Sequence, residues 1–311
     1  MASNTFLERN DLPLKKVEGK GFNAWFIGSN MISHGRTYNV FYPREGRPLS
    51  IKFNLKGQAT YEFGRARLAV DETVYFVMND GQSYSSQIQS ESEVEYLSVF
   101  FSQDFARKVR NSCKINNEQL LDEPGRLSSD PVEFFERLYP HNRAVTTYLT
   151  KIHMAVSQGI PDSGWLDEQI HWLLAGLLQV HQQVQRDADA FPFVRRSTRR
   201  EIYRRLHVAR DFIDSNFSDR VSLSRIARAA NFSEHHFLRL FKQAFHETPY
   251  QYLTRKRLEL AKKLILTTEH PITSICVQVG FENPSSFTRL FRQRVGLTPE
   301  SYRSENRSRS R

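Results

Sequence analysis

Cysteine is scarce in this 311-residue sequence, which holds only Cys113 and Cys276, far apart and in no metal-binding or redox spacing. Long apolar runs are also missing, since none approaches the ~20 residues that a membrane-spanning helix needs. Residues 1–16 carry scattered charges instead of the continuous apolar stretch of a signal peptide. These absences predict a reduced, cytoplasmic protein without a membrane partner.

Recognisable catalytic motifs are absent as well. The sequence has no glycine-rich phosphate loop and no G-x-S-x-G nucleophile motif. His34 is the only histidine between residues 20 and 101, whereas a metal site needs several converging ligands. His235 and His236 are adjacent and point to different sides of a helix, so they form no chelate. We therefore expect no enzymatic activity, no catalytic residue, no metal and no cofactor.

Positive charge, in contrast, is abundant but confined to one end of the chain. Residues 195–311 contain 24 Lys and Arg against 11 Asp and Glu, a net charge of +13, whereas the first 194 residues contain 20 against 23, a net charge of −3. A partner with dense negative charge would select such asymmetry, and nucleic acid fits better than an anionic membrane. A basic surface that serves only solubility is the other interpretation at this point.

The first two thirds of the chain predict a β-rich domain followed by helices. Between residues 20 and 101, apolar side chains alternate with polar ones, as at Leu49, Ile51 and Phe53, and glycine turn signals separate the segments. Many short strands at close spacing indicate a small antiparallel barrel or sandwich. Helical periodicity begins near residue 134, and the polar, Pro-containing segment 186–200 indicates an interdomain linker.

The clearest helix is predicted for residues 165–185. Its apolar positions are spaced alternately by four and three residues, which is a heptad seam: Leu166, Ile170, Leu173, Leu177 and Val180. The seam predicts a homodimer, because further apolar residues such as Trp172 widen the stripe and leave one side free for a partner. The alternative is an ordinary amphipathic helix that packs on the β-domain of its own chain.

The C-terminal third repeats itself. RLFKQ at residues 239–243 recurs as RLFRQ at residues 289–293, an offset of 50. Upstream, Phe232 matches Phe281 at an offset of 49, so one extra residue must lie between Phe281 and Arg289 in the second copy. Further aligned pairs indicate an internal duplication.

Each copy predicts two helices joined by a short turn. Ser222 and Ser233 are placed to cap the two helices of the first copy, while Gly280 supplies the turn and Asn283 the second cap in the other copy. This is the layout of a duplicated helix-turn-helix. Residues 250–266 predict one longer connecting helix of about 24 Å, which can hold two second helices roughly one DNA turn, about 34 Å, apart.

Residues 204–303 resemble the DNA-binding domain of the AraC/XylS family of transcription regulators. The resemblance is carried by ITSICVQVGF at residues 272–281, SFTRLFR at residues 286–292 and GLTPESYR at residues 296–303. The family's usual companion, a cupin-type barrel followed by helices, matches the layout of the first two thirds.

The resemblance implies an α+β chain with four parts. These are a cupin-like regulatory and dimerisation domain (1–185), a linker (186–200), an all-α double helix-turn-helix domain (201–303) and a basic tail (304–311). It also implies a sequence-specific transcription regulator, and an activator in particular, that binds double-stranded DNA in two successive major grooves and acts on RNA polymerase. A non-specific or architectural nucleic-acid-binding protein is the alternative, although it would not need two capped recognition helices at a fixed separation.

The second helix of a helix-turn-helix lies in the major groove, where its early outward side chains contact base edges. The base-contacting positions of the family fall on the following residues: His235, Leu238 and Arg239 in the first copy, and Pro284, Ser285 and Arg289 in the second. Arg239 and Arg289 occupy the same place in the repeat, and arginine can donate two hydrogen bonds to guanine. For either arginine, contact with phosphate alone or pairing with Glu234 or Glu282 is the alternative.

Several further residues are predicted to contact phosphate because they are basic or stand at helix N-termini. They are Ser222, Arg225, Ser233, Lys242, Arg255, Arg257 and Arg292. The Arg- and Ser-rich tail is predicted to be disordered and to add only sequence-independent attraction to DNA.

The β-domain gives a weaker functional signal. The family resemblance implies effector sensing, dimerisation or both. Four aromatic residues are candidates to line a pocket for a small-molecule effector: Trp25, Tyr61, Tyr75 and Tyr96. A plain hydrophobic core is the other interpretation of these residues, and no cluster of charge points to a class of ligand.

Overall fold

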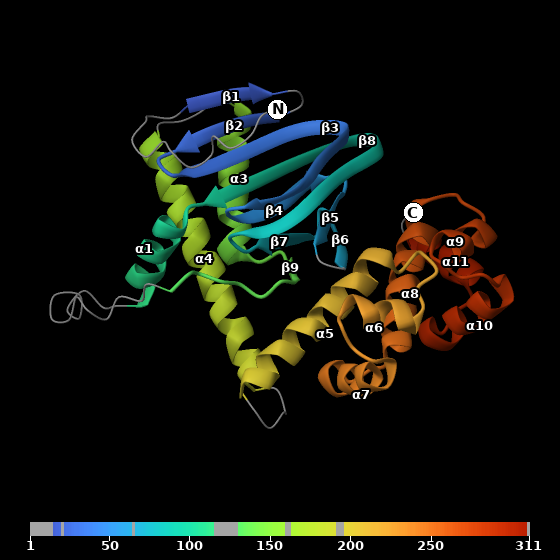
Figure 1. Ribbon diagram of the computed structural model, residues 1–311. Coiled ribbons are helices and arrows are strands. Elements are labelled where there is room, and N and C mark those ends of the chain that lie inside the picture. Colours follow the sequence, from blue (N-terminus) through green and yellow to red (C-terminus); the bar gives the residue numbers. More distant parts are fainter. Residues whose placement is uncertain are drawn as a thin grey trace. The chain divides into compact units, whose positions relative to one another are not determined.

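A computed structural model of the chain describes residues 15–19, 22–63, 66–114, 130–158, 163–190 and 196–309. The chain divides into two compact units, residues 1–204 and 205–311 (Figure 1). No helix among the described residues is long and apolar enough to cross a membrane.

The first unit is built on one antiparallel sheet. Its strands are β1 (Lys15–Gly19), β2 (Phe22–Ile27), β3 (Asn30–Arg47), β4 (Leu49–Lys56), β5 (Ala59–Phe63), β6 (Ala66–Val70), β7 (Val74–Met78), β8 (Gln82–Phe101) and β9 (Leu138–Pro140). They pair in the order β1-β2-β3-β8-β4-β7-β9, and β5 bridges β8 and β6 as a branch. The expected antiparallel β-domain followed by helices is confirmed, and the pairings among the described strands trace an open, branched path.

Two of the strands are much longer than the sequence pattern suggests. β3 and β8 have 18 and 20 residues and pair with each other, with register shifts between Thr37 and Asn39 and between Tyr42 and Glu45. Such irregularities bend a strand and increase its twist. The bends interrupt the alternation of apolar and polar residues, which explains why sequence reasoning breaks these strands into shorter pieces.

Helices cover one face of this sheet. They are α1 (Gln103–Lys114), α3 (Arg143–Gln158) and α4 (Ser163–Asp189), and the main core of the unit contains buried side chains from all three (Figure 1). On β4, Leu49, Ile51 and Phe53 join this core, whereas the alternate residues Ser50 and Lys52 lie on the opposite face. Both sets are buried, so β4 is covered on both sides.

The residues predicted to form a dimer seam lie in this core. Leu166, Ile170, Leu173 and Leu177 are at most 2% exposed, and Val180 packs against the same cluster. Their apolar surface is thus buried within the chain, where α4 packs chiefly against α3 and α1, and is not available to a second chain. This corrects the seam assignment in favour of the alternative, a helix that packs on its own domain. Trp172, by contrast, is 46% exposed on α4.

The predicted linker 186–200 lies largely in two helices. α4 continues to Asp189 and α5 (Arg196–Asn216) begins six residues after Ala190, while residues 191–195 lie outside the described residues. The Arg200 guanidinium binds the Asp189 carboxylate through two hydrogen bonds of 3.0 Å. The two flanks of the predicted linker are thus helical, as suits Gln, Arg and Ala, which are good helix formers, and α4 and α5 remain separate helices. The functional division of the chain at this segment stays a prediction.

The second unit is helical throughout its regular structure. After the end of α5 it contains α6 (Leu223–Ala229), α7 (Glu234–Phe245), α8 (Pro249–Thr267), α9 (Ile272–Gln278), α10 (Pro284–Val295) and α11 (Pro299–Arg309). The predicted all-α domain of two helix-turn-helix motifs and a long connecting helix is therefore confirmed. The tail differs from the prediction: residues 304–309 continue α11 and are not disordered, while residues 310 and 311 lie outside the described residues.

Candidate DNA-binding surface

The first helix-turn-helix is formed by α6 and α7. The Ser222 hydroxyl accepts a hydrogen bond of 3.2 Å from the Arg225 amide and caps α6. Asn231 makes the turn with a φ of 55°, a left-handed conformation that asparagine tolerates. Phe237 and Phe241 are fully buried on the inner side of α7. The inner face is thus fixed, and the opposite face of α7 points to solvent.

The second helix-turn-helix repeats this construction with α9 and α10. Gly280 takes the turn position of Asn231, with a φ of 91°. The Asn283 carboxamide accepts hydrogen bonds from the amides of Ser285 and Ser286, at 2.9 and 3.1 Å, and caps α10. The extra residue of this copy is Glu282, which precedes the cap and lies within the predicted interval.

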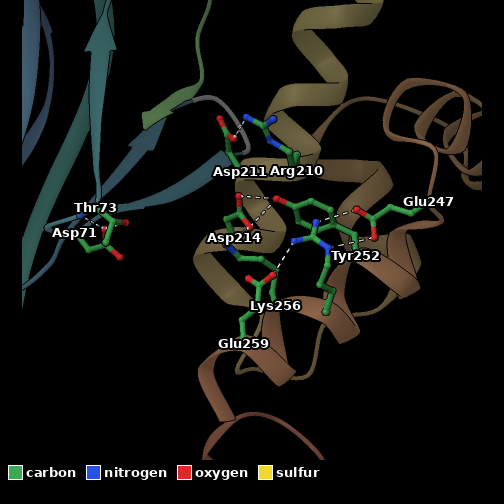
Figure 2. Close-up of polar contacts among 10 residues, drawn as sticks. Asp71, Thr73, Arg210, Asp211, Asp214, Glu247, Tyr252, Lys256 and Glu259 are labelled. Atoms are coloured by element: carbon green, nitrogen blue, oxygen red, sulfur yellow. Dashed lines mark hydrogen bonds and ion pairs between the residues drawn. The ribbon is translucent and has the colours of Figure 1, made fainter. Parts of the chain in front are cut away.

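The helix that connects the two motifs is held to its neighbours by contacts in its N-terminal half. At its N-terminus, Thr248 and Gln251 form a reciprocal capping box. The Tyr252 hydroxyl donates to the Asp214 carboxylate of α5 at 2.9 Å, and Lys256 Nζ lies 3.3 Å from Asp214 Oδ1 (Figure 2). With 19 residues, α8 is about 28 Å long, which suits two helices that enter neighbouring turns of DNA.

All six residues predicted to contact bases are exposed on these two helices. His235, Leu238 and Arg239 lie on the outer face of α7, where Leu238 is 36% exposed. Pro284, Ser285 and Arg289 lie on α10 and line a shallow hollow together with Arg292.

The two arginines are free to meet a ligand. Neither Arg239 nor Arg289 has an ion pair among the described residues, and both side chains are exposed. The alternative that Arg289 is neutralised by Glu282 does not hold in this structure, because Glu282 binds Arg220 at 2.9 Å. An exposed guanidinium on the outer face of a recognition helix can donate to a base edge or to a phosphate.

The predicted phosphate contacts separate into two groups. Arg225, Lys242 and Arg292 are exposed, as are the helix-capping positions Ser222 and Ser233. These five residues remain candidates.

Arg255 and Arg257 instead have structural partners in the chain. Arg255 binds Glu247 at 2.8 Å and Glu259 at 3.0 Å. Arg257 is half-buried and donates to the backbone carbonyls of Phe217 and Asp219, at 2.7 and 2.8 Å. Both side chains thus have a structural role within the chain, and their contact with phosphate stays a prediction.

The candidate effector residues are buried but do not gather at one place. Trp25 and Tyr75 belong to the core between the sheet and the helices. Tyr61 lies among Phe76 and Tyr84 in another aromatic cluster, and the Tyr96 hydroxyl bonds that of Tyr42 at 3.1 Å. Trp25 and Tyr75 are therefore explained as core.

Sequence reasoning missed a buried lysine near the second aromatic group. Lys52 is 3% exposed, and its ammonium lies 3.9 Å from the ring centre of Phe100 and 5.2 Å from that of Tyr84. It forms no ion pair with a carboxylate among the described residues, and burial lowers its pKa well below the ordinary value. No signal in the sequence marks Lys52, because it shares the polar alternate positions of its strand with Ser50 and Asn54, which is the pattern of a solvent-exposed face.

Comparison with known proteins gives the same assignment for the second unit. A family model described as a helix-turn-helix domain matches residues 226–305. The probable transcriptional regulator LumQ of Photobacterium leiognathi is 34% identical over 92 residues, which are 30% of this chain and 37% of LumQ. The regulatory protein SoxS of Salmonella typhimurium is 30% identical over 93 residues, which are 30% of this chain and 87% of SoxS. The solved C-terminal domain of AraT, a response regulator of Geobacillus stearothermophilus, is 31% identical, covers 32% of this chain and 84% of its own, and has a TM-score of 0.32.

Proposed function

Because this chain belongs to the AraC/XylS family of helix-turn-helix transcription regulators, we propose that it binds specific double-stranded DNA sites and regulates transcription. In this proposal α7 and α10 enter two successive major grooves. The observation that carries it is the placement of Arg239 and Arg289. They are equivalent in the repeat, exposed on the outer faces of the two recognition helices, and without an ion pair among the described residues.

The same observation favours specific binding over an architectural role. A non-specific protein needs positive charge along the phosphate backbone but no fixed distance between two recognition helices. Here a capped, 19-residue helix separates the two motifs and is itself held to α5 through Tyr252 and Asp214. A rigid separation supports recognition of two base-pair groups about one turn of DNA apart.

A selection from a degenerate DNA library tests this proposal. Replacement of Arg239 or Arg289 by alanine should weaken binding to the selected site by about 1–3 kcal/mol and relax the preference at one base pair each. The two relaxed positions should lie about 10 base pairs apart. Arg294→Ala is the matched control: it removes the same charge from α10, five residues further on and so on another side of the helix. Unchanged discrimination in both test variants, or an equal loss in the control, would refute the assignment.

The regulatory output belongs to the same proposal. We expect activation through contact with RNA polymerase, as the family resemblance implies. A promoter fusion with a selected site should show higher expression in the presence of the protein, and lower expression would identify a repressor.

A homodimer also stays part of the proposal, but since the seam is buried it must use another surface, for which Trp172 on α4 is the candidate. Sedimentation of the intact protein at tens of micromolar, with and without DNA, tests it.

Lys52 supports a response to a small molecule. Lys52 is buried between aromatic rings, and the charged group that acts on it is the Arg47 guanidinium, which lies over the same Tyr84 ring. An ammonium in this place is unfavourable without a counter-charge, and an organic anion would supply one. We therefore include an anionic effector in the proposal. Carboxylic acids should raise the melting temperature of the wild type, while their matching amides should not. Lys52→Met should lose this distinction, and an equal response to acids and amides would exclude the anionic effector.

A further inference from the structure

Three side chains from distant parts of the first unit meet at one point. His34 lies on β3, Glu95 on β8 and His153 on α3. His34 Nε2 is 2.8 Å from Glu95 Oε1, and His153 Nε2 is 2.9 Å from the same oxygen. One possible ligand atom from each residue lies within 4.8 Å of the other two, and no other such group of histidine, cysteine and carboxylate residues occurs in the part of the chain that the structure describes.

This arrangement has the chemistry of a metal site. Two imidazoles and one carboxylate are a recurrent ligand set for divalent first-row metals, which leaves further positions for water. With metal–ligand bonds of about 2.1 Å, two ligand atoms at right angles are about 3 Å apart, close to the observed 2.8 and 2.9 Å. The Ser157 hydroxyl, 3.0 Å from His153 Nε2, is an additional oxygen at the same place.

The surroundings hold the two imidazoles in position. His34 is buried, its ring stacks on Trp25 at a centroid distance of 6.5 Å, and its edge meets the His153 ring at 5.2 Å. The Arg36 guanidinium also binds Glu95 Oε1, at 3.1 Å, and would compete with a cation for this oxygen. Since the Arg36 side chain is 55% exposed, it can turn into solvent when a metal binds.

We propose that His34, Glu95 and His153 bind one divalent first-row transition metal ion, which connects α3 to strands β3 and β8. In the metal-free chain, hydrogen bonds between the imidazoles and the carboxylate occupy the site, and the ion replaces their protons. The site lies on the helix-covered side of the sheet, whereas Lys52 lies on the opposite face, and all three ligands belong to the first unit.

Equilibrium dialysis of the full-length protein tests this proposal. After treatment with EDTA, the protein is dialysed against micromolar Zn²⁺ and its bound zinc is measured by mass spectrometry. The wild type should bind about one equivalent more than Glu95→Gln or His153→Gln, with at least tenfold weaker binding in both variants. His270→Gln, which removes an exposed histidine of the second unit, should equal the wild type. Equal zinc content in the wild type and both test variants, or no zinc in the wild type, would overturn the proposal.

Two further measurements keep the test valid if a variant is unstable. Zinc should raise the melting temperature of the wild type but not that of His153→Gln, whose amide can still hydrogen-bond Glu95 and so preserve the metal-free contact. Arg36→Gln removes the competing cation without removing a ligand, so it should bind Zn²⁺ several-fold more tightly than the wild type. A weaker affinity in Arg36→Gln would contradict the arrangement proposed for the site.

Discussion

The turn of the second helix-turn-helix is the most demanding position in the backbone of the DNA-binding unit. Gly280 has a φ of 91°, and a Cβ placed on it would lie 2.8 Å from the Ser218 carbonyl oxygen and 3.0 Å from the Arg257 guanidinium. The guanidinium cannot move freely, because it donates to the carbonyls of Phe217 and Asp219. Gly280→Ala therefore combines backbone strain with a steric clash.

The expected loss of stability follows from these two costs. A positive φ costs a residue with a Cβ about 1–2 kcal/mol, and overpacking costs about 1–3 kcal/mol more. Gly280→Ala should thus lower the free energy of unfolding of the second unit by about 3 kcal/mol. Gly296→Ala is the matched control, since Gly296 has a φ of 89° but nothing within 4 Å of its added Cβ. It should lose only the smaller, conformational part.

Urea unfolding of the full-length protein can measure this effect in one unit alone. All three tryptophans, Trp25, Trp165 and Trp172, belong to the first unit. Tryptophan fluorescence therefore reports the first unit, whereas far-ultraviolet circular dichroism reports both. With a slope of about 1.5 kcal/mol/M, Gly280→Ala should shift the helical transition of the second unit down by about 2 M and leave the fluorescence transition unchanged. Equal shifts for Gly280→Ala and Gly296→Ala would show that the close approach to Ser218 contributes nothing to the loss in the free energy of unfolding.

Three other predictions concern DNA affinity, pH and the core. If the fragment 195–311 neutralises about six phosphates, the slope of log affinity against log salt should be near −5, and a slope shallower than about −2 would argue against a surface that follows DNA. Burial, with a smaller effect of Arg200, lowers the pKa of His181 to about 4, so the fold prefers the neutral imidazole while the unfolded chain takes up a proton below pH 6.5. Stability should therefore fall as the pH falls, by about 2 kcal/mol between pH 7 and 5. His181→Leu should remove this contribution in fluorescence-detected urea unfolding, and the dependence that remains should come from groups such as His34, whose pKa burial also lowers. Leu173→Asp should unfold the first unit at every protein concentration, because it buries a carboxylate, and a folded variant that only changes its sedimentation would restore the dimer seam.

The helix-turn-helix motifs could be predicted from sequence because their determinants are local. The caps at Ser222 and Asn283 and the glycine at 280 lie within a few residues of the helices that they define. Helical periodicity identifies the residues that point into the core, and the arginines occupy the remaining, outward positions of the same helices. The structural role of Arg257 could not be predicted, because its acceptors, the Phe217 and Asp219 carbonyls, are 40 and 38 residues away. The ion pair of Arg255 with Glu259 could have been predicted, since Glu259 stands four residues later on the same helix face.

The structure of the first unit was harder to predict from sequence, because its determinants are not local. Its organisation depends on pairing between distant segments, such as His34 with Glu95 and His153, which are 61 and 119 residues from it. His34 is the only histidine within residues 20–101, where the strands are predicted, and the second histidine, His153, lies on α3 outside that range. The strand β9 was also missed, because its three residues pair with β7 from more than 60 positions away.

The α4 helix shows where hydrophobic periodicity stops being informative. A spacing of four and three residues establishes that one side of a helix is removed from water, but it does not identify the surface that covers that side. In this chain the covering surface is formed chiefly by α3 and α1, so Leu173 and Leu177 stabilise the first unit and are buried away from any interface. In a coiled coil the seam is the only apolar stripe of the helix, and the rest of its surface is polar. Here Leu174 and Leu178, which lie beside the seam, are buried as well. The width of the apolar surface, more than its period, therefore distinguished a core helix from a dimer seam.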